Sequence, residues 1–206
     1  MKPIDQKIYL ASKSPRRREL LRQIGVEFEL LLLREHTARG PDVPELVLPG
    51  EAPLAYVERV TREKVETACD TMLSRRLPVR PVLTADTTVT LDGRILGKPA
   101  NVAEAIDMLR LLSGRTHQVL TSVAVHAERV AEQITQVSNV RFSKLTPEQI
   151  RAYCATPEPY DKAGGYGIQG PAALFIEHIE GSHSGIMGLP LFETADLLRQ
   201  AGLKLP

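Results

Sequence analysis

The sequence is short of the residues that mark several classes of protein. It has no Trp, 4% aromatic residues and two Cys among 206 residues. Lys and Arg number 26 against 25 Asp and Glu, which leaves a formal net charge of +1. So balanced a chain, with few aromatic side chains for base stacking, argues against a strongly basic nucleic-acid-binding protein. Any anionic ligand would therefore be met by a local cluster of basic side chains.

Cysteine usage and hydropathy narrow the expected compartment. Cys69 and Cys154 lie far apart and have no metal-ligand spacing, so we expect no disulfide framework. The chain has no apolar run of about 18 residues, the length that predicts a membrane span. Its first residues include Asp5 and lack the apolar stretch of a secretion signal. We expect a cytoplasmic protein that does not contact membranes.

What is present is typical of a globular protein, with 43% hydrophobic and 25% charged residues. The predicted strands cover residues 8–11, 81–91, 94–96, 117–126, 133–142 and 172–179. The predicted helices cover 15–21, ending near Gly25, then 53–76, 101–112, a short helix from Thr146, and 191–200, with loops at 36–53 and 156–171. This order predicts an α/β or α+β fold with a mixed sheet. We expect a single domain over 1–206, with a smaller lobe at roughly 100–155.

A basic segment, Ser12 to Arg18, follows the first predicted strand and opens the first helix. A helix N-terminus carries partial positive charge and free N–H groups, both of which attract phosphate. Arginines in a first turn oppose that dipole, so a sequence that accepts this cost predicts a bound anion nearby. The alternative is a basic turn exposed to solvent.

Two charged side chains occupy positions where apolar residues are expected. Lys64 falls in the middle of the apolar face of the predicted helix 53–76, and it either extends along that face to solvent or points into a cleft. Asp86, at the end of the apolar run that opens strand 81–91, is costly to bury without a partner. It is equally compatible with a strand-end cap and with a catalytic carboxylate. Lys98 follows the hairpin at Asp92-Gly93 and returns to the region of Asp86.

A glycine-rich segment, Asp161 to Gly170, contains the spacing G-x-G-x-x-G at Gly165, Gly167 and Gly170. Dinucleotide binding requires a strand before this motif and a helix after it. Here Asp161 and Lys162 precede it and Pro171 follows, so we reject that interpretation. Two interpretations remain: the loop brings backbone amides and the Gln169 side chain toward a base or a phosphate, or it is a plain glycine-rich turn.

Together these segments resemble the motifs of the Maf family of nucleotide pyrophosphatases. The matches are Leu10–Leu21 (LASKSPRRRELL), Pro49-Gly50-Glu51, Arg62-Glu63-Lys64, Ala85-Asp86-Thr87, Gly97-Lys98-Pro99, Asp161–Gly170 and Gly188-Leu189-Pro190. They occur in order and span nearly the whole chain. The resemblance implies two α/β lobes around a central cleft, similar to the inosine-triphosphatase architecture, and a possible homodimer. Val65, Gly165 and the Ser182–Gly185 segment depart from the commoner family residues without removing a charged group.

The resemblance also implies an activity and its residues. The family cleaves nucleoside triphosphates to a monophosphate and pyrophosphate with a divalent metal, Mg²⁺ or Mn²⁺. Gly167–Gly170 together with Ser14–Arg17 resembles the branch that cleaves dTTP and UTP, with the clearing of modified or non-canonical nucleotides as its expected purpose. The implied roles are Asp86 as catalytic base, Glu45 and Asp86 as metal ligands, Arg16, Thr87 and Gln169 as base-selecting residues, and Ser12, Ser14, Arg17, Lys64, Lys98 and Lys162 as further substrate-binding residues.

Besides dTTP and UTP cleavage, two other functions and one question about a metal remain open from the sequence. The 7-methyl-GTP branch typically has Glu-Gly where this chain has Gln169-Gly170, so cleavage of that or another non-canonical nucleotide is the second enzyme hypothesis. A non-enzymatic regulator that binds nucleic acid or a protein partner through the Ser14–Arg17 helix is the third. The acids Asp42, Glu45 and Glu51 in the loop 36–53 either reach a metal or are solvated.

Overall fold

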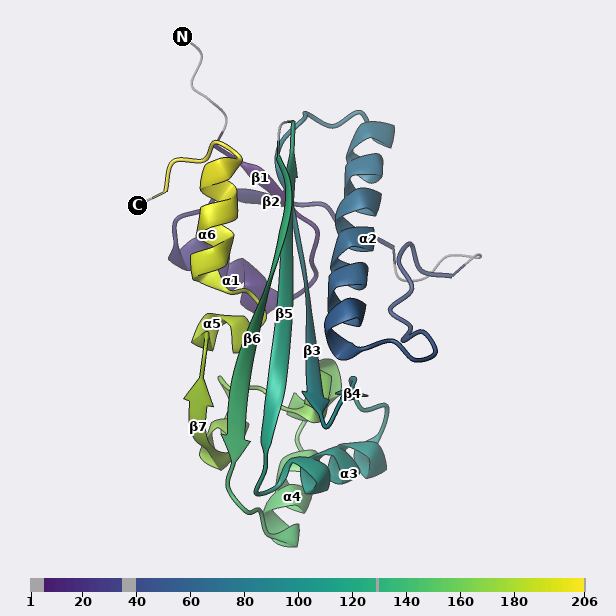
Figure 1. Ribbon diagram of the computed structural model, residues 1–206, viewed down its shortest axis with the longest axis vertical. Coiled ribbons are helices and arrows are strands. Elements are labelled where there is room, and N and C mark those ends of the chain that lie inside the picture. The colour runs from purple at the N-terminus through teal and green to yellow at the C-terminus, as the bar shows by residue number, and fades with distance from the viewer. Residues whose placement is uncertain (1–5, 35–39, 129, 206) are drawn as a thin grey trace.

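The computed structural model describes residues 6–34, 40–128 and 130–205. Within them, seven strands form one mixed sheet in the order β2-β1-β3-β5-β6-β7, with β4 paired to β3 (Figure 1). The strands are β1 (Ile8–Leu10), β2 (Phe28–Leu30), β3 (Val82–Leu91), β4 (Arg94–Leu96), β5 (Thr116–Ala127), β6 (Val130–Phe142) and β7 (Ile176–Glu180). The helices are α1 (Pro15–Gln23), α2 (Pro53–Ser74), α3 (Val102–Leu112), α4 (Pro147–Cys154), α5 (His183–Ile186) and α6 (Leu191–Gln200). The predicted mixed α/β fold is confirmed.

Strand direction follows from the connections. β1 runs parallel to β2 and to β3, and the connections after β1 and β2 contain α1 and α2, as parallel pairing requires. β3 and β4 are antiparallel and joined by Asp92 and Gly93, whose φ angles are 51° and 76°. Two consecutive positive φ angles are the geometry of a tight hairpin turn that matches the twist of its strands.

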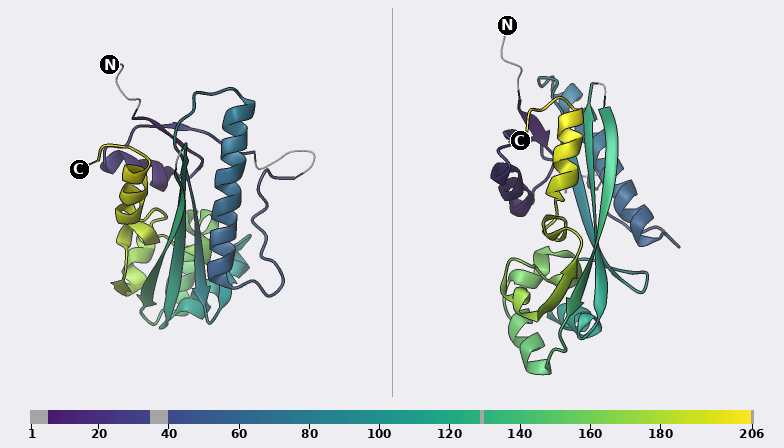
Figure 2. Two further views of the ribbon diagram at one scale, coloured as in Figure 1. Left: turned by 45° about the horizontal axis from the view of Figure 1, so that its top comes forward. Right: turned by 60° about the vertical axis from the view of Figure 1, so that its left-hand side comes forward.

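Helices cover both faces of the sheet (Figure 2). α2 lies on one face, and α1 and α6 lie on the other. Both faces of β3 are therefore buried, with Val82 and Leu83 fully enclosed. An apolar core that includes Leu109 of α3, Phe142 of β6 and Ile150 of α4 fills the end of the sheet away from α1 and α6.

Capping residues set the helix ends where the sequence predicted them. Ser14 Oγ accepts the Arg17 N–H of α1 at 3.4 Å, and Gly25 follows this helix with φ 72°. Asn101 Oδ1 accepts the Glu104 N–H of α3 at 3.0 Å. Thr146 and Gln149 cap α4 reciprocally.

Three predictions of secondary structure were wrong or incomplete. Residues 172–175 of the predicted strand 172–179 belong to a 3-10 turn, Pro171–Phe175, and only Ile176–Glu180 pairs with β6. Pro171 lacks the N–H that a ladder requires. β2 and α5 were not predicted, because neither short segment is an apolar run: β2 is Phe-Glu-Leu and α5 is His-Ser-Gly-Ile.

Three expectations about absent features can be compared with the structure. Cys69 and Cys154 are free thiols. No helix among the described residues is long and apolar enough to cross a membrane. Of the predicted loop 36–53, residues 36–39 lie outside the described residues, and residues 40–52 contain neither helix nor strand.

Candidate active site

A cleft of about 850 Å³ lies between α1, α2, β3, β4 and the glycine-rich loop. Its lining includes every residue that the sequence analysis assigned to the site. These are Ser12, Ser14, Arg16, Arg17, Glu45, Lys64, Asp86, Thr87, Lys98, Lys162 and Gln169. The fold thus brings together side chains from segments far apart in the sequence.

β3 presents Asp86 to the cleft from the middle of the strand. Asp86 pairs with Ser122 of β5 in the sheet register, with strand residues on both sides, so the hypothesis of a strand-end cap is wrong. Its side chain is 10% exposed. A carboxylate so enclosed needs a partner, and Lys64 Nζ supplies one at 2.7 Å from Oδ1.

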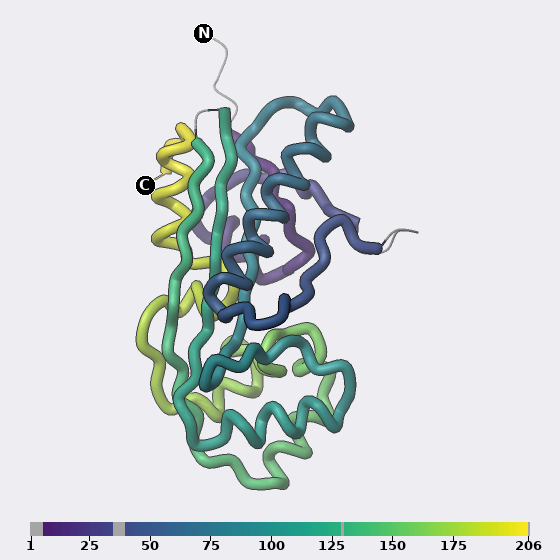
Figure 3. The backbone as a smooth tube through the Cα atoms, turned by 45° about the vertical axis from the view of Figure 1, so that its right-hand side comes forward, coloured from purple at the N-terminus to yellow at the C-terminus, as the bar shows by residue number. Residues whose placement is uncertain are grey.

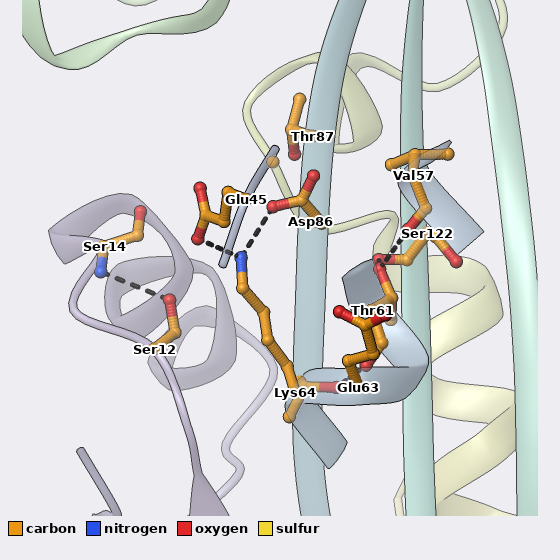
Figure 4. A network of polar contacts seen from close by, with 12 residues as sticks. Ser12, Ser14, Glu45, Val57, Thr61, Glu63, Lys64, Asp86, Thr87 and Ser122 are labelled. Atoms are coloured by element: carbon orange, nitrogen blue, oxygen red, sulfur yellow. Dashed lines mark hydrogen bonds and ion pairs between the residues drawn. The ribbon is translucent and has the colours of Figure 1, made fainter. Parts of the chain in front are cut away.

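Lys64 reaches this position from the buried side of α2 (Figure 4). Its ammonium lies 2.6 Å from Glu45 Oε1 and 2.7 Å from Asp86 Oδ1, and its side chain is 14% exposed. Of the two alternatives, the structure therefore supports an ammonium directed into the cleft over one that extends to solvent. Lys64 joins two carboxylates that are 41 positions apart in the sequence.

The charge of Glu45 is favoured by this environment. Burial alone raises the pKa of Glu45, but the positive charges of Lys64, Lys98 and Arg17 outweigh it and hold the pKa below its ordinary value. Glu45 is therefore an anion at neutral pH. Its side chain is 46% exposed, which leaves it accessible to a ligand in the cleft.

Arg17 connects three parts of the chain at the cleft wall. Its Nε donates to the Gly188 carbonyl at 2.7 Å, and its two terminal nitrogens donate to Ser12 Oγ and Thr87 Oγ1, each at 3.1 Å. Burial lowers the pKa of Arg17, which nonetheless stays far above neutral pH for a guanidinium. Thr87 Oγ1 also lies 3.0 Å from Thr121 Oγ1. The hydroxyls of Ser12 and Thr87 thus orient the guanidinium.

Asp161 is a cleft residue that the sequence analysis did not assign a role. Its carboxylate accepts from Arg16 of α1 at 3.3 Å and from Lys162 at 2.5 Å. Burial raises the pKa of Asp161, and Lys162 and Arg16 lower it to a net value below the ordinary one. The signal available in the sequence was an acid next to a predicted substrate-binding lysine. Two predicted substrate-binding cations, Arg16 and Lys162, therefore share one carboxylate.

The glycine-rich loop contains a short 3-10 turn, Ala163–Gly165, and is flanked by two others, Glu158–Asp161 and Pro171–Phe175. No strand–loop–helix unit surrounds the motif in this described part of the chain, in agreement with the rejected dinucleotide interpretation. Gly164 has φ 71°, and a Cβ there would lie 2.9 Å from Val89 Cγ1. Glycine at this position lets the loop pack on β3, and Gln169 is exposed in the cleft lining.

Two acids of the loop before α2 are committed to arginines. Asp42 binds Arg34 at 2.9 Å, and Glu51 binds Arg59 at 2.6 Å. The hydrogen bond from Arg59 and that from the Leu48 N–H lower the pKa of Glu51 to about 2. Of the three acids considered for a metal, Glu45 is the one found among the described residues that line the cleft.

The donors in the cleft fit a hard divalent cation that binds to the protein through few carboxylates. Among the described residues, no group of three or more His, Cys, Asp or Glu side chains is arranged to hold a metal. Glu45 and Asp86 nevertheless place carboxylate oxygens around one position, now contacted by Lys64. Mg²⁺ commonly binds through one or two carboxylates together with substrate phosphates, and this pair fits that mode.

Comparison with known proteins agrees with the motifs found in the sequence. Residues 7–201 match the family model described as Maf-like protein. The chain belongs to the Maf family. A relative in Ralstonia nicotianae is 56% identical over 199 residues, covering 96% of this chain and 95% of its own, and one in Aromatoleum aromaticum is 55% identical over the full length of both chains. Both relatives are named dTTP/UTP pyrophosphatase.

A solved structure, that of the Staphylococcus aureus Ham1 protein, aligns with 66% of this Maf chain and 71% of its own at 16% identity. Its TM-score of 0.43 is too low to support an argument about architecture or function. The assignment to the Maf family, predicted from the motifs, rests on the family match and the close relatives.

Proposed function

We propose that this chain hydrolyses dTTP and UTP to the nucleoside monophosphate and pyrophosphate. The observation that supports it most directly is an enclosed carboxylate, Asp86, in a cleft lined by basic side chains. A nucleoside triphosphate carries about four negative charges, which Lys and Arg side chains neutralise through charge-assisted hydrogen bonds. Five of the basic side chains in the lining are assigned to the triphosphate: Arg16, Arg17, Lys64, Lys98 and Lys162. Relatives at 55–56% identity, named for dTTP and UTP, support the choice of substrate.

Asp86 is the general base in this proposal. It takes a proton from a water molecule as that water attacks the α-phosphorus, and the bond to the bridging oxygen breaks in line so that pyrophosphate leaves. Lys64 fixes the orientation of the carboxylate through the 2.7 Å contact. Arg17, itself oriented by Ser12 and Thr87, binds phosphate oxygens.

Glu45 and Asp86 would hold the divalent cation, Mg²⁺ or Mn²⁺. A bound cation of this kind neutralises charge on the phosphate oxygens. Glu45 is anionic at neutral pH, as that role requires. Lys64, which contacts both carboxylates, keeps them together until the cleft is filled.

Base selection is assigned to Gln169, Arg16 and Thr87. The Gln169 amide offers one acceptor and two donors, which complement the N3–H and O4 edge shared by thymine and uracil. Arg16 and Ser14 stand at the start of α1, where N–H groups and the helix dipole favour an anionic group. The low aromatic content accords with selection by hydrogen bonds more than by stacking.

The cellular setting is part of the proposal. A cytoplasmic enzyme of this specificity removes modified or non-canonical pyrimidine nucleotides before they are used. The homodimer that the family resemblance implies also stays a prediction, as do the single domain over 1–206 and its smaller lobe at roughly 100–155.

A panel of nucleoside triphosphates with Mn²⁺, assayed for pyrophosphate, tests the substrate. We expect release from dTTP and UTP to exceed release from dATP, dGTP, dCTP and 7-methyl-GTP. Activity on purine nucleotides alone would favour the second enzyme hypothesis instead. Inactivity on every member would favour a regulator that binds nucleic acid or a protein partner.

A further inference from the structure

The loop that holds Glu45 needs support from outside itself. Between residues 40 and 52 it has no helix or strand, so no backbone ladder fixes it. Figure 3 shows this segment running beside α2 before it turns into the start of that helix. Its Glu45 side chain nevertheless meets Lys64 Nζ at 2.6 Å.

Arg59 of α2 supplies much of that support. Its Nε and one terminal nitrogen bind the two oxygens of Glu51 at 2.6 and 2.8 Å. The same terminal nitrogen donates to the Leu46 carbonyl at 2.8 Å. The side chains of Arg59 and Glu51 are 19% and 8% exposed, and a two-point pair of a guanidinium and a carboxylate is geometrically specific.

Two more hydrogen bonds complete the attachment. Glu51 Oε2 accepts the Leu48 N–H at 3.0 Å, and Tyr56 of α2 donates its hydroxyl to the Glu45 carbonyl at 3.3 Å. α2 thus holds the consecutive carbonyls of Glu45 and Leu46. Fixing both carbonyls restricts the backbone at Glu45 and with it the direction of the carboxylate.

We propose that Arg59 and Glu51 are positioning residues that hold Glu45 in the cleft for the divalent cation. This inference rests on the proposed function, because it deepens the role assigned to Glu45. Glu51 itself is paired with Arg59 and serves the metal only through the shape of the loop. From the sequence, Glu51 is one of three acids that could reach a metal, and no local pattern distinguishes Arg59.

The chain offers a matched pair of variants for the test. Glu51→Gln removes the charge that ties the loop to Arg59. Glu63→Gln removes the other carboxylate bound to Arg59, at 3.1 and 3.3 Å, with the same change of charge. Glu63 lies on α2 itself and is bound to Arg59 from within the helix, so its loss leaves the loop contacts in place.

Two measurements apply to both variants. Hydrogen exchange at residues 44–50 reports the loop in metal-free protein. Electron paramagnetic resonance measures free Mn²⁺ while the protein is added at a fixed concentration of a non-hydrolysable dTTP analogue. The loss of the free Mn²⁺ signal reports metal binding by the protein. We expect Glu51→Gln to exchange faster in this segment and to bind Mn²⁺ about tenfold more weakly, as a lost outer-shell partner does. Glu63→Gln is expected to match the wild type in both.

The opposite results are equally definite. Equal loop exchange in the two variants, or faster exchange with unchanged Mn²⁺ binding, would overturn the positioning role. If Glu51→Gln does not fold, Arg59→Lys takes its place: it keeps the charge, but one ammonium does not span Glu51 and the Leu46 carbonyl together. Failure of the proposed function would give a different result. The wild-type protein would release no pyrophosphate, while Glu51→Gln would still show faster loop exchange and weaker Mn²⁺ binding.

Discussion

His117 is a buried side chain whose charge state is coupled to folding. It is 1% exposed, and its Nε2 lies 2.6 Å from the Tyr166 hydroxyl. Its Nδ1 is buried without a hydrogen-bond partner among the described residues. Burial lowers the pKa of His117 to about 4, so the native imidazole is neutral at pH 7. Tyr166 belongs to the glycine-rich loop, so this pair ties the loop to β5.

Stability is expected to fall as this histidine becomes protonated. The unfolded chain binds the proton below about pH 6.5, whereas the native state resists it down to about pH 4. The free energy of unfolding is therefore fully present above pH 6.5 and falls as pH drops through this window, by about 3 kcal/mol. Urea unfolding at pH 7 and pH 4.5 measures it.

His117→Phe isolates this contribution. The variant loses the hydroxyl's partner and is less stable at pH 7, but the decline of its stability between pH 6.5 and 4 should be smaller than in the wild type. An equal decline in both proteins would mean that other groups cause it.

Gln169→Glu tests the base-selecting residue. A carboxylate accepts hydrogen bonds but no longer donates, so one edge atom of thymine or uracil loses its partner. We expect kcat/KM for dTTP and UTP to fall roughly tenfold relative to other nucleotides, the effect of one lost hydrogen bond. Kinetics on the nucleotide panel measure it.

The control for that substitution is Gln118→Glu, which changes an exposed glutamine on β5. It should keep the wild-type substrate ranking. An unchanged ranking in Gln169→Glu as well would remove Gln169 from the base pocket.

At this scale, polar motifs identified the side chains that line the cleft but not those that support them. Asp86 and Lys64 stood out because a charge interrupted an apolar pattern. Arg59 did not, because a surface arginine on a helix is ordinary and its partner Glu51 belongs to a loop whose path the sequence does not show. The Arg16–Asp161 contact joins residues 145 positions apart, which no local pattern reveals.

Among the elements, helices were the most predictable. α3 and α6 were found nearly residue for residue, because an apolar stripe marks the buried side of each helix and Asn101 marks the start of α3. β2 and the 3-10 turn at Pro171–Phe175 were missed, since tertiary pairing decides such short segments. The parallel pairing of β1 and β3 depends on crossover packing that no single strand encodes.

The cap of α3 gives a prediction for this scale. Asn101 Oδ1 satisfies the Glu104 N–H, and Glu104 accepts the Ala100 N–H at 2.9 Å in return. Asn101→Ala is expected to lower the free energy of unfolding by about 1 kcal/mol without changing activity. Urea denaturation measures it, with the exposed Gln118→Ala of β5 as a surface comparison. Equal stability of Asn101→Ala and wild type would show that packing alone holds α3.

Over the whole molecule, the near-zero net charge conceals a local arrangement. The chain has 26 basic and 25 acidic residues, yet seven of the basic ones line one cleft, including the five predicted to bind the substrate. Carboxylates share them: Glu45 and Asp86 contact Lys64, while Asp161 contacts Arg16 and Lys162. Such a cleft suits a small polyanion with its cation better than an extended nucleic acid.

The most direct test of this account is pyrophosphate release from dTTP by Asp86→Asn. The substitution keeps the shape of the side chain and removes the proton acceptor, so we expect turnover to fall by at least roughly 100-fold with the fold retained by circular dichroism. Asp92→Asn is the control, since Asp92 is an exposed turn residue with φ 51°, which Asn also adopts. Near-normal turnover in a folded Asp86→Asn protein would contradict the account.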